Sequence, residues 1–134
     1  MFVDASAIVA ILTSEPVAQD LLDRLDTAES AITSPIAIFE AAAGIRRKRR
    51  STAAEALADV QEFLALSRIR TVAIEALDAA AAIDAFGRFG KGSGHPAQLN
   101  MGDCFAYAVA RRANAPMLFT GEDFLRTDAP VAGR

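Results

Sequence analysis

Hydrophobic positions along this chain alternate between short continuous runs and longer segments with helical spacing. The short runs predict four strands and a brief edge strand near the end of the chain, over residues 1–3, 31–33, 69–72, 117–120 and 130–132. Apolar residues three and four positions apart predict helices over 5–12, around 21–25, from 35 to the basic residues 46–50, around 57–64, and over 74–89 and 102–114.

Residues that cap helices support several of these boundaries. Ser34 and Pro35 suit the N-cap and first position of the third helix, and Ser51 or Thr52 suits the N-cap of the fourth. For the alanine-rich helix over 74–89, we expect the larger apolar side chains to form the buried face, namely Leu77, Ile83 and Phe86.

Strands that alternate with helices predict an α/β fold, with a parallel β-sheet flanked by helices. The chain has 134 residues and shows no repeat or linker, so we expect residues 1–134 to form a single domain. In such folds, ligands bind at the carboxyl ends of the strands.

Composition and charge narrow the class of protein. An apolar fraction of 52% excludes a disordered chain, and uncharged apolar stretches such as 5–14 are about half as long as a membrane span requires. The N-terminus lacks the features of a signal peptide, and the single cysteine cannot form an internal disulfide. We therefore expect a cytoplasmic protein with no membrane association.

A basic run interrupts this acidic chain, whose net charge is −3. Five consecutive cations occupy residues 46–50 at the predicted end of a helix. They suit a solvated helix C-terminus, and they also suit contact with nucleic acid. From this feature alone, the solvated helix end is the favoured interpretation.

Three carboxylates stand apart from the other charges. Asp4 follows the first strand, and Glu40 interrupts an otherwise apolar helix. Asp103 lies in the stretch 92–110, which, leaving His95 aside, contains no other charged side chain. A fourth acidic position, Glu122 and Asp123, directly follows the last main strand.

Helix capping is an alternative explanation for two of these acids, Asp4 and Asp103. It does not explain Glu40, because a carboxylate on a core-facing helix surface is costly unless it is paired or coordinated. Several carboxylates in one site repel one another unless a divalent cation neutralises them. Oxygen ligands without His or Cys suit Mg²⁺ or Mn²⁺, and the natural chemistry of such a site is phosphodiester hydrolysis by metal-activated water.

The residues around these acids resemble the acidic blocks of PIN-domain ribonucleases. The resemblance lies in residues 2–7, in Glu40 within the helix that begins at Ser34-Pro35, in residues 99–108 and in residues 118–124. Residues 88–92 and the closing Thr127-Asp128 more closely resemble VapC toxins of bacterial type II toxin–antitoxin systems. The blocks occur in the family's order over essentially the whole chain.

This resemblance implies a PIN fold and the toxin component of a VapBC-type system, an endoribonuclease that depends on Mg²⁺ or, as a substitute, Mn²⁺. It also implies a homodimer and inhibition by a cognate VapB antitoxin. By position, Asp4, Glu40 and Asp103 match the three core acids that bind the metal.

The fourth acid is Glu122 or Asp123, with a narrow preference for Glu122. Ser6 matches the family's small hydroxyl residue, which positions the first carboxylate or a water molecule, although Ala5 replaces the frequent Thr of that motif. Lys91 and Asn100 flank the third acidic block and are candidates for contact with substrate phosphate.

Other functions remain as alternatives at this stage. A phosphatase or receiver domain also places an Asp after its first strand, but the phosphatase pattern requires a second acid two residues later, where this chain has Ser6. A metallonuclease that cuts DNA uses the same phosphodiester chemistry, since only 2′-hydroxyl contacts or strand shape separate the two substrates. A degenerate PIN module that only binds a partner is a third alternative, and retention of every acidic position argues against it.

Overall fold

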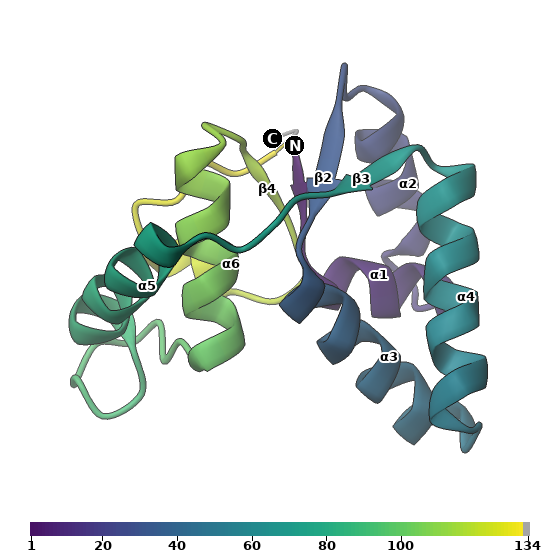
Figure 1. The fold of residues 1–134 in the computed structure, drawn as a ribbon, viewed down its shortest axis with the longest axis horizontal. Helices are drawn as coiled ribbons and strands as arrows, with labels where there is room; N and C mark the ends of the chain where they lie inside the picture. Colours follow the sequence, from purple (N-terminus) through teal and green to yellow (C-terminus); the bar gives the residue numbers. More distant parts are fainter. Residues whose placement is uncertain (133–134) are drawn as a thin grey trace.

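The computed structural model describes residues 1–132 and confirms the α/β architecture with a parallel sheet (Figure 1). The strand order is β3-β2-β1-β4, and each neighbouring pair is parallel. The strands are β1 (Phe2–Val3), β2 (Ala31–Thr33), β3 (Ile69–Thr71) and β4 (Met117–Leu118). The helices are α1 (Ala5–Leu12), α2 (Ala18–Asp26), α3 (Pro35–Arg49), α4 (Ala53–Leu66), α5 (Ala76–Phe89), α6 (Met101–Arg112) and the short 3₁₀ helix η1 (Phe124–Arg126).

The helices pack on both sides of the sheet. In Figure 1, α5 and α6 lie together on one side, whereas α3 and α4 lie together on the other. Helix α1 packs against α2 and α3, and α3 also contacts α6. The helices that carry Glu40 and Asp103 are therefore neighbours, although these two residues are far apart in the sequence.

The short strands are fixed by their pairing and by the helix caps that follow them. Phe2 pairs with Ile32 on one side and with Met117 on the other. The predicted cap of α3 is confirmed, because the Ser34 hydroxyl accepts a hydrogen bond from the backbone N–H of Ala37 at 3.2 Å. Such a cap ends the strand and starts the helix within one residue, so the beginning of α3 lies at the carboxyl end of β2.

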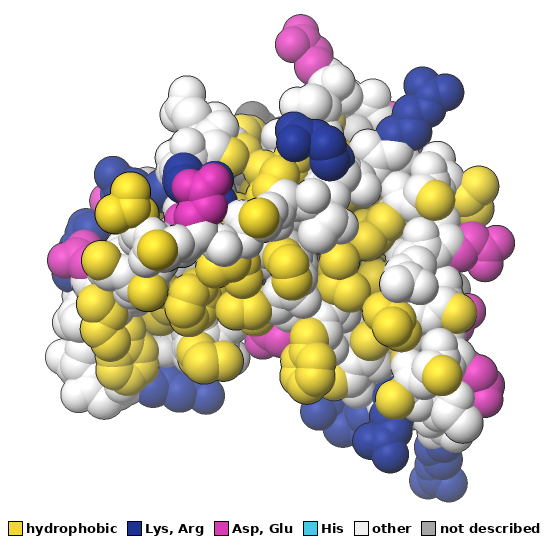
Figure 2. All heavy atoms as spheres, in the orientation of Figure 1, with side chains coloured by type: hydrophobic (Ala, Val, Ile, Leu, Met, Phe, Trp, Pro, Cys, Tyr) yellow, Lys and Arg dark blue, Asp and Glu magenta, His cyan; other side chains and the backbone are white. Residues whose placement is uncertain are grey.

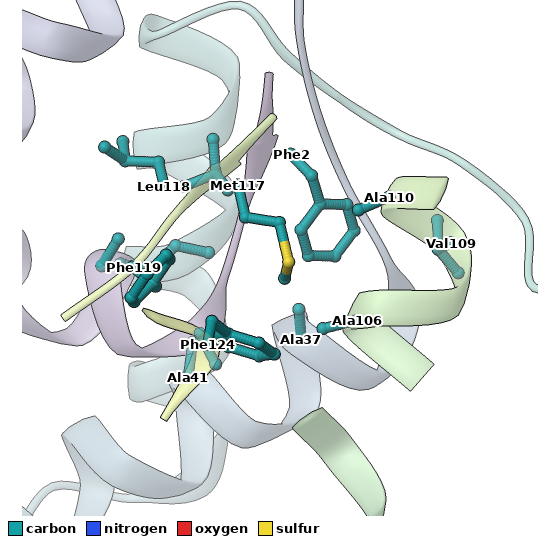
Figure 3. Close-up of a cluster of buried hydrophobic side chains, with 14 of the residues drawn as sticks. Phe2, Ala37, Ala41, Ala106, Val109, Ala110, Met117, Leu118, Phe119 and Phe124 are labelled. Carbon is teal, nitrogen blue, oxygen red and sulfur yellow. The ribbon is translucent and has the colours of Figure 1, made fainter. Parts of the chain in front are cut away.

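A core of small and large apolar side chains joins the sheet to its helices (Figure 3). Phe2 of β1 and Met117 of the neighbouring β4 are fully buried, and the ring of Phe124 packs edge-on against Phe119 with centroids 5.1 Å apart. Small side chains let the helices approach the sheet and each other closely, because they occupy little space. Those labelled in Figure 3 are Ala37 and Ala41 on α3 and Ala106 and Ala110 on α6.

The predicted buried face of α5 is wrong. Leu77 is 77% exposed, Ile83 is 67% exposed and Phe86 is 41% exposed. The buried positions of this helix are Asp78, Ala82, Ala85 and Phe89. Helix α5 packs against α6, and the face that carries Ala82 and Ala85 is buried, so tertiary packing overrides the preference of the larger apolar side chains for burial.

Several element boundaries also differ from the predictions. The last main strand ends at Leu118, and the third ends at Thr71. The edge strand over 130–132 is reduced to a single parallel bridge between Val131 and Met117. Helix α5 begins at Ala76, where Glu75 and Asp78 form a capping box. These shifts move helix and strand ends by one or two residues and leave the order of elements unchanged.

Hydrophobic side chains form a band across the face seen in Figure 2, over α5, α6 and α3. Between α5 and α6, a hollow of about 230 Å³ is lined by apolar side chains that include Ile83, Phe86 and Met101. None of the helices described over residues 1–132 combines the length and apolar character needed to cross a membrane.

Candidate active site

Asp4 is held at the end of β1 by a small hydrogen-bond network. Its carboxylate accepts hydrogen bonds from the hydroxyl of Ser6 at 2.6 Å and from the backbone N–H of Ser6 at 3.0 Å. The Ser6 hydroxyl in turn accepts from the backbone N–H of Thr120 at 3.0 Å. Asp4 is buried, and desolvation raises its pKa above the ordinary value despite the hydrogen bonds that favour the ionised form. Ser6 thus connects the first carboxylate to the segment that follows β4.

Glu40 lies on the second turn of α3 and faces the first turn of α6. A methyl group placed on the α-carbon of Gly102 would overlap the Glu40 carboxylate. Among residues 1–132, no side chain or backbone group forms a hydrogen bond or ion pair with Glu40 in the structure. Desolvation, followed by repulsion from Asp4 and then from Asp103, raises the pKa of Glu40 to about 7. This half-buried carboxylate therefore lies among other carboxylates without a compensating cation from the protein.

Asp103 occupies the first turn of α6 in a reciprocal cap with Asn100. Its carboxylate accepts from the backbone N–H of Asn100 at 3.0 Å, and the Asn100 side chain accepts from the backbone N–H of Asp103 at 2.9 Å. Desolvation is the largest cause that raises the pKa of Asp103 to about 6, and repulsion from Asp4 and Asp123 adds to it. The hydrogen bond from Asn100 and the charge of Lys91 act in the opposite direction.

The two candidates for the fourth acid have different surroundings. Glu122 forms an ion pair with Arg126 at 2.9 Å, and its side chain is 73% exposed. Asp123 forms no ion pair within the part of the chain that the structure describes, and its charge contributes to the raised pKa of Asp103. These surroundings favour Asp123 as the acid that acts together with Asp4, Glu40 and Asp103.

The carboxylates interact electrostatically without forming a closed cage. Over residues 1–132, no group of three or more His, Cys, Asp or Glu side chains converges tightly enough to constitute a preformed metal site. The donors are nevertheless all oxygens, and desolvation followed by repulsion from the other acids raises the pKa values of Glu40 and Asp103. A carboxylate set of this kind fits a hard divalent cation, which would offset the repulsion. In Figure 2, acidic side-chain atoms are visible between α6 and the start of α3.

Comparison with known proteins identifies the family to which the chain belongs. The family model for the PIN domain matches residues 1–130. The chain belongs to the PIN-domain family. This PIN domain is 39% identical to a VapC ribonuclease of Rhizobium meliloti, over 95% of this chain and 97% of that protein. It is 38% identical to ribonuclease VapC42 of Mycobacterium tuberculosis, over 96% and 95% of the two chains. It is 39% identical to ribonuclease VapC of Mycolicibacterium smegmatis, over 96% of each chain.

Two residues of this PIN domain take part in the site without a prediction from the sequence. Gly102 supplies the space that the Glu40 carboxylate occupies, and Thr120 supplies a backbone N–H to Ser6. The signal for Gly102 was a glycine inside the first turn of a helix, where glycine is unfavourable without a specific reason. The sequence carries no signal for Thr120, because its contribution comes from the backbone.

The basic run of this PIN domain forms the last turn of α3. Lys48 pairs with Glu15, and Arg49 pairs with Asp59 at 3.5 Å. Over the described residues, Arg46, Arg47 and Arg50 form no ion pair. Arg47 is seven positions after Glu40, which places both on the same side of α3 about 10 Å apart along the helix axis.

Proposed function

We propose that this PIN domain is the toxin ribonuclease of a VapBC-type toxin–antitoxin system and that it requires Mg²⁺, or Mn²⁺ as a substitute. The observation that carries the proposal is Glu40, a half-buried carboxylate that is close enough to Asp4 and Asp103 for their charges to add to the rise in its pKa, and that forms no ion pair within residues 1–132. The relatives named as VapC ribonucleases support RNA as the substrate.

Asp4, Glu40 and Asp103 would hold the divalent ion, and Asp123 would complete the acidic set. When bound, a divalent cation in such a site increases the acidity of water and stabilises negative charge on phosphate oxygens. The hydrogen bonds from Ser6 hold the Asp4 carboxylate in one orientation, and the reciprocal cap with Asn100 does the same for Asp103. Asp4 and Asp103 thus present their carboxylate oxygens in fixed directions at this edge of the sheet.

Recognition of the substrate would use cations near the acids. Lys91 lies close enough to Asp103 for its charge to lower the pKa of that carboxyl, so its ammonium group suits a phosphate that approaches the site. Asn100 is exposed at the N-cap of α6, but its side chain is engaged with the backbone of Asp103. We therefore assign Lys91 to substrate contact and Asn100 to positioning.

The proposal includes the family's partners. A VapB-type antitoxin would bind this chain and inhibit cleavage, and the active form would be a homodimer in the cytoplasm. Size-exclusion chromatography with light scattering measures the oligomeric state. The antitoxin proposal is tested by co-expression with a VapB-type antitoxin, followed by co-purification and an RNA cleavage assay of the complex.

The decisive experiment compares the parent with Asp4→Asn and Asp103→Asn on single-stranded RNA, structured RNA and single-stranded DNA, with Mg²⁺ or with EDTA. Asparagine keeps the capping hydrogen bonds and removes the charge. We expect cleavage of RNA by the parent in Mg²⁺ only, no cleavage by either variant, and unchanged circular dichroism. Asp26→Asn, at an exposed acid outside any ion pair that the described residues form, is the matched control and should retain full activity. Full activity in either site variant, or in EDTA, would contradict the proposal, and preferential cleavage of DNA would favour the DNA-directed alternative.

A further inference from the structure

We infer that Gly102 is a positioning residue, because the absence of a side chain there leaves the space that the Glu40 carboxylate occupies. This inference rests on the function proposed above. Gly102 is buried at the second position of α6, directly before Asp103. Glu40 reaches it from α3, on the neighbouring helix. The two residues are separated by 62 positions in the sequence, so only the packing of α3 against α6 brings them together.

The contact is steric, and Glu40 forms no ion pair within residues 1–132. All three atoms of the carboxylate group lie within the space that a β-carbon on Gly102 would fill. No hydrogen bond within residues 1–132 holds the Glu40 side chain, whereas Asp4 and Asp103 are each oriented by hydrogen bonds. The surface of the Gly102 backbone is therefore what determines how close Glu40 comes to Asp103. A side chain at position 102 would move the carboxylate away from the other two acids.

Helix propensity provides a test in which two glycine-to-alanine substitutions are expected to change Tm in opposite directions. Alanine normally stabilises a helix relative to glycine, because glycine loses more conformational freedom when it folds. Gly87 in α5 is the matched control, since a β-carbon there meets no atom within 4 Å. Gly87→Ala should raise Tm by about 2–4 °C. Gly102→Ala should lower Tm in EDTA, because the overlap with Glu40 outweighs the gain in helix propensity.

Removal of the Glu40 side chain should reverse the sign of the Tm change that Gly102→Ala causes. In a Glu40→Ala background the three atoms nearest to a β-carbon at position 102 are gone, so Gly102→Ala should now raise Tm, as Gly87→Ala does. The experiment measures Tm in EDTA for the parent, the two single variants at positions 40 and 102, the double variant, and Gly87→Ala in both backgrounds. If Gly102→Ala changes Tm by the same amount and sign in both backgrounds, Gly102 does not position Glu40 and the inference is wrong.

Mn²⁺ affinity is a second readout, which would not change if Gly102 served only the packing of the helix. Electron paramagnetic resonance measures free Mn²⁺ directly, without substrate or turnover. We expect Gly102→Ala to weaken Mn²⁺ binding roughly tenfold or more, as loss of a supporting residue commonly does, and Gly87→Ala to leave it unchanged. The double variant should bind no more weakly than Glu40→Ala alone, because both changes act through one carboxylate. Wild-type affinity in Gly102→Ala would overturn the inference.

The two proposals fail in different ways. If the parent chain binds no Mn²⁺, the proposed metal-dependent function is wrong, whatever the Tm values show. If the parent binds Mn²⁺ and Asp4→Asn abolishes binding, but the Tm change does not reverse sign, the function stands and the role of Gly102 is refuted.

Discussion

Glu40→Gln should make the metal-free protein more stable at alkaline pH. The substitution keeps the shape of the side chain and removes its ionisation. A pKa of about 7 in place of the ordinary 4.5 corresponds to about 3 kcal/mol of unfavourable free energy for the ionised carboxylate. Because Glu40 is only half-buried, solvent screening lowers the expected penalty to about 1–2 kcal/mol. We expect this gain in the free energy of unfolding for the Gln variant at pH 8.

The sign of the pH dependence follows from the raised pKa. A carboxyl group whose pKa is higher in the folded state stabilises the fold at low pH, and this contribution is lost as pH rises through the folded pKa. For Glu40 the loss falls between about pH 4.5 and 7. The Gln variant does not titrate at this position, so its advantage over the parent should be near zero at pH 4.5 and reach its full value by pH 8.

Urea unfolding in EDTA, followed by circular dichroism at several pH values, measures this difference. Saturating Mg²⁺ at pH 8 should stabilise the parent more than Glu40→Gln, because the cation offsets a repulsion that the variant lacks. The matched control is Glu29→Gln, at an exposed acid outside any ion pair described for residues 1–132, which should leave the curves unchanged. If the Gln variant is no more stable than the parent at pH 8, the ionised Glu40 carboxylate does not destabilise the metal-free fold and the reasoning is refuted.

Two further predictions concern the fourth acid and the basic run. Asp123→Asn should raise the Mg²⁺ concentration required for half-maximal RNA cleavage, whereas Glu122→Gln should leave it within about twofold, since Glu122 is paired with Arg126. The opposite result in a Mg²⁺ titration would assign the role to Glu122. Replacement of Arg46 and Arg47 by Gln should reduce the salt dependence of RNA binding by about one unit of slope for each phosphate that these side chains neutralise in the parent. Lys48→Gln should change the slope less, because an ion pair already holds Lys48. An unchanged slope in the Arg46 and Arg47 variants would mean that the basic run is only a solvated helix C-terminus.

The order and type of the elements could be predicted because each depends on local information. The cap at Ser34 with Pro35 after it, and the short buried run that ends at Asp4, are visible in a single stretch of sequence. The buried face of α5 could not be predicted in the same way. Leu77 and Ile83 are exposed because α6 packs against the alanine face, and hydrophobicity alone does not tell which apolar face a neighbouring helix contacts.

The acids of the candidate site could be identified from the sequence because an isolated charge in an apolar segment is costly. Their roles relative to one another could not, because these depend on distances between segments. Glu122 and Asp123 are adjacent in sequence, and two features of the folded chain distinguish them: the ion pair of Glu122 with Arg126 and the effect of the Asp123 charge on Asp103. Gly102 is a stronger example, since its importance lies in a contact with a residue on another helix.

Capping and metal binding are compatible explanations for two of the acids. Asp4 caps α1 and Asp103 belongs to the cap of α6, as their positions at the start of helices suggested. A cap fixes a carboxylate through one oxygen atom and leaves the other free, so the same contact that stabilises the helix also orients the acid. Both Ser6 hydrogen bonds reach one oxygen of Asp4, and the cap contact of Asp103 likewise uses one oxygen. A helix that begins at the end of a parallel strand can thus hold an acid in a defined direction, and Glu40, which caps nothing, requires a glycine on the neighbouring helix for the same purpose.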